Sequence, residues 1–449
     1  MEDKKISLEE LEQHSNWTSI NGKVYDLTEF IENDIHPGGS IIRLALGRDA
    51  SDLFQSYHSG EGMLSVRRMI PTLPVVGTHT AERGSVQGVL SKTPNHMDSG
   101  HKFYITLRQR VERALEEEGH TRHSFELLHL VEFMVTVGLY LLCSANCILD
   151  DSLIWPVLSG IVIGRLGFMQ HTGNHCAASI YSAVNEWVGK SMNWIGGNQV
   201  VWRHEHQIAH HLAPNVLGKD NDCEIGYPYI RLHPDLEWKW YHIFQPLTVL
   251  LGMSVGLVKW NLSDLIHLRD RKVGNVPIRS LTRQEVTELI FSKVSWWTVH
   301  FVLPCVSWGV WNGIQNGLLK FAIASLYIEN IFIVNHIQEN NQSLSNSTSK
   351  SSKSESEHWA IQQVKGTSNW SSGSTWWNWF SGGLNHQIEH HLFPSIHPYV
   401  YPRIANIVQE TCQDFGLEYH SYSSFGTAWC HMFKHIGLLG FNRHLKKRD

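Results

Sequence analysis

Apolar and polar stretches alternate along most of the chain. After a largely polar beginning come five apolar runs, at residues 127–149, 153–169, 242–260, 294–311 and 318–334. A helix that spans a bilayer needs roughly 20 consecutive apolar residues, and these runs lie near that length. Polar residues interrupt several of them, namely Glu132, Arg165, Lys320 and Glu329. The pattern predicts membrane-spanning helices, with the buried core helices of a soluble protein as the alternative.

The charge of the connecting segments orients these runs. The segment after residue 260 is basic, with Arg269, Arg271, Lys272, Arg279 and Arg283. Positively charged loops stay on the cytoplasmic side, whereas the linkers 150–152 and 312–317 contain no Lys or Arg. We therefore expect an all-α membrane domain with about four spanning helices in two hairpins, 127–169 and 294–334. The run 242–260 either spans the membrane or lies along its interface.

Changes in composition predict four regions. They are a small globular domain at 5–80, a polar linker with a charged helix at 81–125, the membrane domain at 126–430 and a basic tail at 431–449. The Ser/Asn-rich stretch 339–357 predicts a flexible loop. Asn346 in this loop begins a glycosylation sequon, which the expected topology leaves cytoplasmic and unmodified.

Composition narrows the class of protein. The 37 Lys and Arg against 42 Asp and Glu give a net charge of −5, which does not suggest a nucleic-acid binder. The 18 Trp suit a membrane interface. The 7 Cys form no CxxC pair, so neither a zinc site nor a disulfide framework is indicated. The polar start predicts no cleavable signal peptide.

Two histidines in the first 60 residues indicate a haem site. His36 begins His-Pro-Gly-Gly, and His58 follows Phe54-Gln-Ser-Tyr. A six-coordinate haem needs two facing imidazoles, each presented by a tight turn or a helix end. The surrounding pattern, from Trp17 through Gly47-Arg-Asp, resembles the cytochrome b5 domain over residues 5–75. The resemblance implies an α+β fold, haem b, His36 and His58 as axial ligands, and a role as electron carrier.

Three further histidine clusters lie just outside the apolar runs. They are His171-Thr-Gly-Asn-His175, His204-Glu-His206-Gln-Ile-Ala-His210-His211 and His386-Gln387-Ile-Glu-His390-His391, with His336 at the end of the last run. Histidines four apart share one face of a helix and can reach the same metal ion. Imidazole suits iron, copper or zinc, but about eight histidines exceed the needs of one tetrahedral zinc and suit two metal ions.

This arrangement resembles the membrane fatty acid desaturase and hydroxylase family. The fused cytochrome b5 domain and the form Gln387-x-x-His390-His391 are similar to the front-end desaturases, over residues 5–420. The resemblance implies two iron ions, dioxygen as co-substrate, and a cytosolic cap of histidine boxes. The implied metal ligands are His171, His175, His206, His210, His211, His336, Gln387, His390 and His391. Asn174, Glu205 and Asn335 are candidates for orienting these imidazoles.

Three positions depart from the family pattern. Thr172 stands where Asp is usual, so a carboxylate that orients a ligand is expected to be missing. The second box is HxxxHH rather than HxxHH. His386 replaces an aromatic residue and, like His204, is an alternative ligand.

The implied activity is oxygen-dependent desaturation of a polyunsaturated fatty acyl chain at the delta-4, delta-5 or delta-6 position. The substrate carrier is a membrane lipid or coenzyme A, and NADH-cytochrome b5 reductase is the expected electron source. The tail Lys446-Lys447-Arg448 is similar to an endoplasmic-reticulum retrieval signal, which requires a cytosolic C-terminus in a multi-pass protein. The alternatives are a sphingolipid long-chain-base desaturase, a fatty-acyl hydroxylase and a non-catalytic membrane haem or metal protein.

Overall fold

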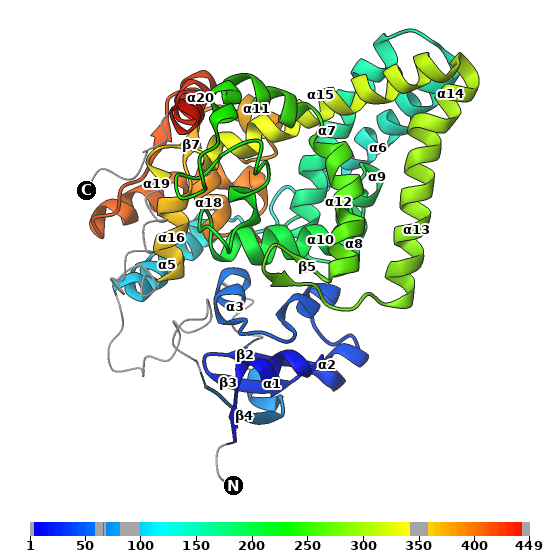
Figure 1. The fold of residues 1–449 in the computed structure, drawn as a ribbon. Coiled ribbons are helices and arrows are strands. Elements are labelled where there is room, and N and C mark those ends of the chain that lie inside the picture. Colours follow the sequence, from blue (N-terminus) through cyan, green and yellow to red (C-terminus); the bar gives the residue numbers. More distant parts are fainter. Residues whose placement is uncertain (1–3, 59–65, 67–68, 81–98, 342–357, 442–449) are drawn as a thin grey trace.

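The computed structural model describes residues 4–58, 66, 69–80, 99–341 and 358–441. An N-terminal module of short strands and helices precedes a larger, mostly helical domain (Figure 1). Parts of three predicted regions lie outside the described residues: the start of the linker at 81–98, most of the loop that contains Asn346, and the end of the tail at 442–449.

The N-terminal module is built on a four-stranded sheet. Its order is β1-β4-β3-β2, and the strands are β1 (Lys5–Ile6), β2 (Trp17–Ile20), β3 (Lys23–Asp26) and β4 (Val75–His79). Strands β2 and β3 are antiparallel and join through Asn21 and Gly22, at φ of 51° and 78°. Asn-Gly is the pair that two-residue hairpin turns favour, because both residues tolerate positive φ.

Short helical segments of the module flank its two candidate haem ligands. The helical segments are α1 (Leu8–Gln13), α2 (Thr28–Glu32), the 3₁₀ segments η1 (Gly39–Ala45) and η2 (Ile70–Thr72), and α3 (Ser51–Tyr57). His36 lies just before η1, and His58 directly follows α3. Helix α3 lies on the side of the module that faces the larger domain (Figure 1).

Within the described residues, three helical segments are long and apolar enough to span a membrane. They are α6 (Glu126–Leu149), the segment Arg283–Trp308 and α15 (Val310–His336). The second comprises α13 (Arg283–Trp297), the π-helical η7 (Thr298–Val302) and α14 (Leu303–Trp308). A bent pair is a fourth candidate: Trp240–Ser254, which comprises η6 (Trp240–Phe244) and α11 (Gln245–Ser254), meets α12 (Gly256–Asp270) at 72°. The expectation of a mostly helical domain with three to four apolar helices of spanning length is therefore confirmed.

Helix α7 (Ile154–Asn174) begins one residue into the predicted run 153–169 and is not one of these candidate spans. Its second half is covered almost completely, and it packs against α6 and α15. Glycines allow the close approach to α15. A Cβ atom at Gly160 would lie 2.6 Å from the carbonyl oxygen of Lys320, and one at Gly164 would overlap the ring of Tyr327. Small residues at this spacing are typical of helices that pack tightly in membranes.

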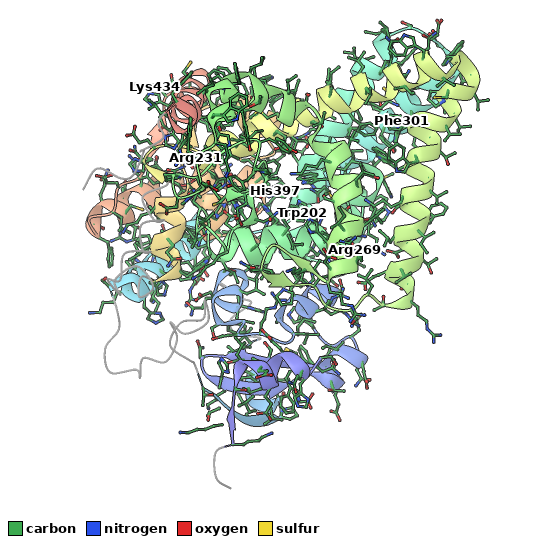
Figure 2. All side chains as sticks on the ribbon, viewed as in Figure 1. Trp202, Arg231, Arg269, Phe301, His397 and Lys434 are labelled. Atoms are coloured by element: carbon green, nitrogen blue, oxygen red, sulfur yellow. The ribbon has the colours of Figure 1, made fainter. Side chains whose placement is uncertain are left out.

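The remaining elements surround the inner ends of α7 and α15. They are α5 (Ser99–Glu117), α8 (Ser182–Gly189), α9 (Ser191–Trp194), α10 (Gln199–Trp202), the π-helical η4 (Arg203–His210), η5 (Asn221–Cys223), β5 (Lys272–Val273), β6 (Val276–Pro277), α16 (Trp359–Gly366), β7 (Asn369–Trp370), α17 (Thr375–Phe380), α18 (Gln387–Leu392), η9 (Pro398–Val400), α19 (Tyr401–Asp414), β8 (Ser421–Tyr422) and α20 (Phe425–Phe441). Trp202 and His397 lie in the interior of this region, away from Phe301 among the long helices (Figure 2).

A substitution at the α7–α15 contact tests this packing. Gly160→Val should lower the free energy of unfolding by about 1–3 kcal/mol, because backbone atoms of α15 cannot move aside for the added carbons. Thermal unfolding in detergent, followed by tryptophan fluorescence, measures the effect. Gly138→Val on α6 is the control, since a Cβ atom there meets open space. Equal melting temperatures for the two variants would contradict the close packing of these helices.

Candidate metal centre and haem cavity

The structure brings all nine predicted ligand residues together from four elements. His171 and His175 end α7, and His336 ends α15. His206 and His210 lie on η4, with His211 as its last flanking residue, and Gln387, His390 and His391 lie on α18. All eight imidazoles are buried. The ends of two long helices therefore meet two short helical segments at one internal site.

Segment η4 differs from the helix expected from the spacing. An ordinary α-helix would place His206 and His210 on one face and rotate His211 away from it. Residues 203–210 form a π-helix instead, whose hydrogen bonds close on the fifth residue. Consequently His211 also turns inward, and its Nε2 lies 3.2 Å from Nε2 of His206. Short π-helical insertions occur frequently at functional sites.

The first group of imidazoles could hold one metal ion. His171, His175, His206 and His390 offer nitrogens that all lie within 4.8 Å of one another. Nε2 of His171 lies 3.0 Å from Nε2 of His206, and Nε2 of His390 lies 3.1 Å from Nε2 of His211. Metal–imidazole bonds of about 2.1 Å at right angles would hold two nitrogens about 3 Å apart. The observed separations therefore match neighbouring ligands of one ion.

The second group comprises His210, His336 and His391, with Gln387 beside them. Nε2 of His210 lies 3.2 Å from Nε2 of His336. The Gln387 amide nitrogen lies 2.9 Å from Nε2 of His336, and its oxygen accepts a hydrogen bond from Asn335. Ligation through the Gln387 oxygen therefore requires the amide to turn over. The His211 and His391 rings stack with centroids 4.2 Å apart and join the two groups.

Nitrogens without partners support the fit to metal ions. Among the residues that the structure describes, Nε2 of His175 and Nε2 of His391 are buried and make no hydrogen bond. Burial, and then the neighbouring imidazoles, hold the pKa of His206, His211 and His390 well below its usual value. These rings are consequently neutral at physiological pH, which is the form that binds metals.

Outer groups fix most of these rings through their second nitrogen. Acceptors near Nδ1 orient an imidazole and select its tautomer. The observed pairs are His210 with Asp220 at 3.0 Å, His336 with the Gly366 carbonyl at 3.2 Å, His390 with the Tyr401 hydroxyl at 3.2 Å, His391 with Gln363 at 2.9 Å and His175 with the Tyr57 hydroxyl at 2.8 Å. Burial lowers the pKa of His210, but Asp220 outweighs it and raises this pKa to about 9.

Two of the predicted orienting residues hydrogen-bond to residues other than the candidate ligands. Asn174 bonds Gln170, Gly189, Gln199 and Arg203, and Glu205 bonds Asn221; among the described residues neither bonds an imidazole. Glu205 nevertheless lies close to the rings, because it lines a small cavity together with His206, His210 and His336. Asn335 does contact the site through Gln387. The sequence analysis missed Asp220, Gln363 and Tyr401, which no local spacing links to the histidines.

Thr172 and the two alternative ligands, His204 and His386, lie off the centre. His204 directs Nδ1 to the Val200 carbonyl at 2.8 Å, and His386 directs Nδ1 to Asn378 at 3.1 Å. The hydroxyl of Thr172 donates to the Phe168 carbonyl one turn earlier in the same helix. These contacts leave the roles proposed for the nine ligand residues intact.

A separate cavity of about 300 Å³ lies between His36 and His58. Its lining is mainly apolar, with Leu27, Phe30 and Phe54 among the contributors, and the two imidazole centroids are 6.1 Å apart. Burial lowers the pKa of His36 to about 4, and its Nδ1 has no hydrogen-bond partner in the described residues. His58 directs Nδ1 to the Phe54 carbonyl at 2.9 Å. Two neutral imidazoles across an apolar cavity fit the ligand requirement of a haem.

A smaller cavity of about 60 Å³ adjoins the second group of imidazoles. His206, His210 and His336 form one side of it, and much of the rest is apolar, with contributions from Ile225, Leu232, Trp260, Phe332, Ile333 and Ile337. Glu205, Asp222 and Glu329 also line it. The apolar part of this lining suits a few methylene groups of a hydrocarbon chain next to the candidate metal ligands.

Comparisons with known proteins agree with this architecture. The fatty acid desaturase family profile matches residues 151–423, and the cytochrome b5-like heme/steroid binding domain profile matches residues 7–80. The chain is 30% identical over 457 residues to an acyl-lipid (8-3)-desaturase of Physcomitrium patens, covering 97% of this chain and 92% of that protein. It is 29% identical over 455 residues to Delta(5) fatty acid desaturase A of Dictyostelium discoideum, covering 97% of this chain and 93% of that protein.

Loss of the Asp220 acceptor should weaken metal binding. One carboxylate oxygen of Asp220 accepts hydrogen bonds from His210 and Asn215, and the other accepts one from Asp222. The amide of an asparagine has one acceptor oxygen, so it can satisfy the donors at only one of these two positions. Asp220→Asn is expected to lower metal affinity on the order of 10–100-fold. Metal analysis of the purified protein measures this. Asp264→Asn removes an equally buried acid that pairs with Lys293 at 2.7 Å, and it should retain the metal. Full metal content in Asp220→Asn would refute the orienting role.

Proposed function

The chain belongs to the fatty acid desaturase family, and from this premise we propose that it inserts a double bond into a polyunsaturated acyl chain on the carboxyl side of an existing one. It is an oxidoreductase with a fused cytochrome b5-like domain. Delta-4, delta-5 and delta-6 are the candidate positions. Two relatives named for delta-5 or (8-3) desaturation support this range.

One observation carries the proposal: two adjoining groups of buried imidazoles whose facing nitrogens lie 3.0–3.2 Å apart. We propose that His171, His175, His206, His211 and His390 hold one iron ion, and that His210, His336, His391 and Gln387 hold a second. Bound there, the two ions would activate dioxygen with electrons received through the haem. Two hydrogens leave the methylene pair, and dioxygen is reduced to water with two further electrons and two protons.

The residues of the chain itself would position the substrate. Phe332, Ile333 and Ile337 lie along the inner end of α15 and line the cavity beside His336. An acyl chain bound against them would place a methylene pair next to the imidazole groups and exclude water from that space. Outer partners such as Asp220 and Tyr401 would hold the ligand rings in place while the substrate binds and leaves.

The long helices place this chemistry at a membrane. We propose two spanning hairpins, 127–169 and 294–334, with the haem module, the histidine boxes and the C-terminus on the cytosolic face of the endoplasmic reticulum. The many exposed apolar side chains on α6 and α13, such as Leu127 and Phe291, support contact with lipid. NADH-cytochrome b5 reductase is the proposed electron source. The domain boundaries proposed are 5–80, 81–125, 126–430 and 431–449.

Lipid profiling tests the reaction. We expect that expression in a yeast without polyunsaturated acids, with one candidate acid supplied at a time, yields a product with a new double bond on the carboxyl side of an existing one. His390→Ala should abolish the product, because it removes a proposed ligand. His204→Ala should retain it, since that ring faces Val200. A hydroxylated product, or a double bond in a long-chain base, would refute the proposed reaction and favour the alternative enzymes.

Absorption spectroscopy tests the haem ligands. Purified wild-type protein should show the Soret band of a six-coordinate haem, and His36→Ala or His58→Ala should lose it, because one axial ligand is then missing. His14→Ala serves as control, since this exposed residue lies outside the cavity lining. Retention of an unchanged Soret band in both axial variants would exclude these two residues as ligands.

A further inference from the structure

Tyr57 links the two candidate cofactor sites. It is the last residue of α3 and directly precedes His58. Its hydroxyl lies 2.8 Å from Nδ1 of His175, and the two rings are nearly parallel, at 14°. His175 belongs to the first imidazole group, where its Nε2 is buried and unpartnered within the part of the chain described. One hydrogen bond therefore joins the haem module to the metal centre.

This contact is unusual among the outer partners of the imidazoles. The acceptors for His210, His336, His390 and His391 are Asp220, Gly366, Tyr401 and Gln363, all from the helical domain. The partner of His175 comes from the N-terminal module instead. A metal ion on Nε2 of His175 leaves the proton on Nδ1, so the Tyr57 oxygen would accept it.

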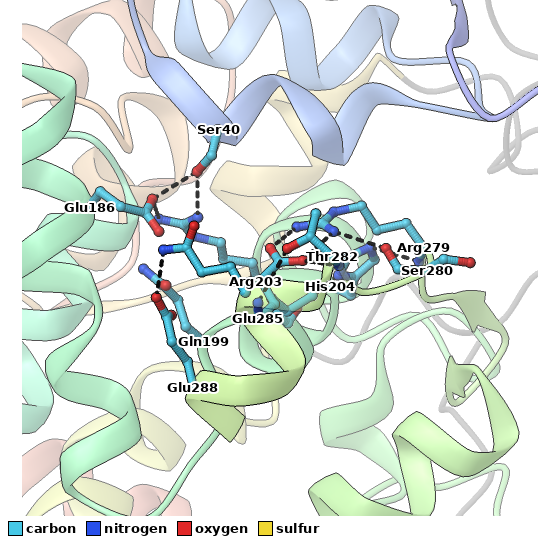
Figure 3. A network of polar contacts seen from close by, with 12 residues as sticks. Ser40, Glu186, Gln199, Arg203, His204, Arg279, Ser280, Thr282, Glu285 and Glu288 are labelled. Carbon is cyan, nitrogen blue, oxygen red and sulfur yellow. Dashed lines mark hydrogen bonds and ion pairs between the residues drawn. The ribbon is translucent and has the colours of Figure 1, made fainter. Parts of the chain in front are cut away.

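An extensive interface holds Tyr57 at this position. Leu44 and Leu53 of the module form one apolar cluster with Ile208 of η4. Ser40 donates to Glu186 at 2.8 Å, and Glu186 pairs with Arg203 at 3.0 Å (Figure 3). Arg203 in turn donates to Asn174, the residue before His175. The same face of the module thus contacts α7 and η4, two of the three segments that carry first-group imidazoles.

We propose that Tyr57 is a positioning residue of the metal centre, so that the docked haem module completes the outer shell of His175. The inference rests on the proposed function, in which His175 binds iron. By linkage, whatever favours docking of the module favours metal binding at His175, and metal binding favours docking.

The same contact provides a continuous connection for electrons. His58 and Tyr57 share a peptide bond, and Tyr57 bonds His175. In each transfer the haem, previously reduced by the reductase, is oxidised by one electron and the metal pair is reduced by one. No bond forms or breaks at Tyr57, and its phenol proton remains in place.

A pair of matched variants in the full-length, haem-containing protein tests the proposal. Tyr57→Phe removes the hydroxyl at His175. Tyr104→Phe also removes one hydroxyl from the interface, where it donates to the Gln55 carbonyl at 3.2 Å, but it touches no candidate metal ligand. Titration of metal-depleted protein with Co²⁺, followed by visible absorption, should show affinity lowered on the order of 10–100-fold in Tyr57→Phe and unchanged in Tyr104→Phe.

Two further readouts complete the test. The Soret band should be the same in both variants, and the pre-reduced haem should be re-oxidised more slowly by oxygen and substrate in Tyr57→Phe alone. A Tyr57→Phe variant that binds Co²⁺ with wild-type affinity would overturn the proposal. An equal loss of Co²⁺ affinity in Tyr104→Phe would also overturn it, because it would indicate that the module has undocked in both variants. Failure of the wild-type protein to bind Co²⁺ would instead overturn the proposed metal centre itself.

Discussion

The structure depends on the burial of eight imidazoles in one small space. Imidazole nitrogens are strong hydrogen-bonding groups, and burying them without partners costs free energy. The chain satisfies Nδ1 of five rings with acceptors at 2.8–3.2 Å and directs Nε2 atoms toward one another. The inward nitrogens are thereby available to the proposed metal ions. The surrounding fold holds these rings in place through the residues that bond their Nδ1 atoms.

The long helices contribute by ending at the site. Helix α7 delivers His171 and His175 with its last turn, and α15 delivers His336. Glycines on α7 allow α15 to approach closely, so both helix ends are held at a defined separation. The shorter segments η4 and α18 then close the site with rings that could not reach it from an exposed loop. The packing of the long helices consequently also determines the positions of the imidazoles at the candidate metal centre.

Much of this could be predicted from the sequence, because the information was local. His-Pro-Gly-Gly at residue 36, His58 and the spacing of the histidine clusters all lie within short windows. The hydrophobic runs likewise predicted long helices where α6, α7 and α15 lie. Asn174 and Glu205 show the limit of such local information. Each is adjacent in sequence to a predicted ligand, but its side chain hydrogen-bonds to another residue. Asp220, Gln363 and Tyr57 approach the rings only through the tertiary fold, and the π-helical form of η4 depends on that same packing.

The apolar cluster at the interface has a consequence for biogenesis. Leu44 and Leu53 belong to a module that a ribosome completes long before residues 203–212 emerge, and domains generally fold in order of synthesis. The face that later covers Ile208 is therefore exposed until residues 203–212 have been synthesised. A chain in which these segments fail to dock would continue to display this apolar face to chaperones.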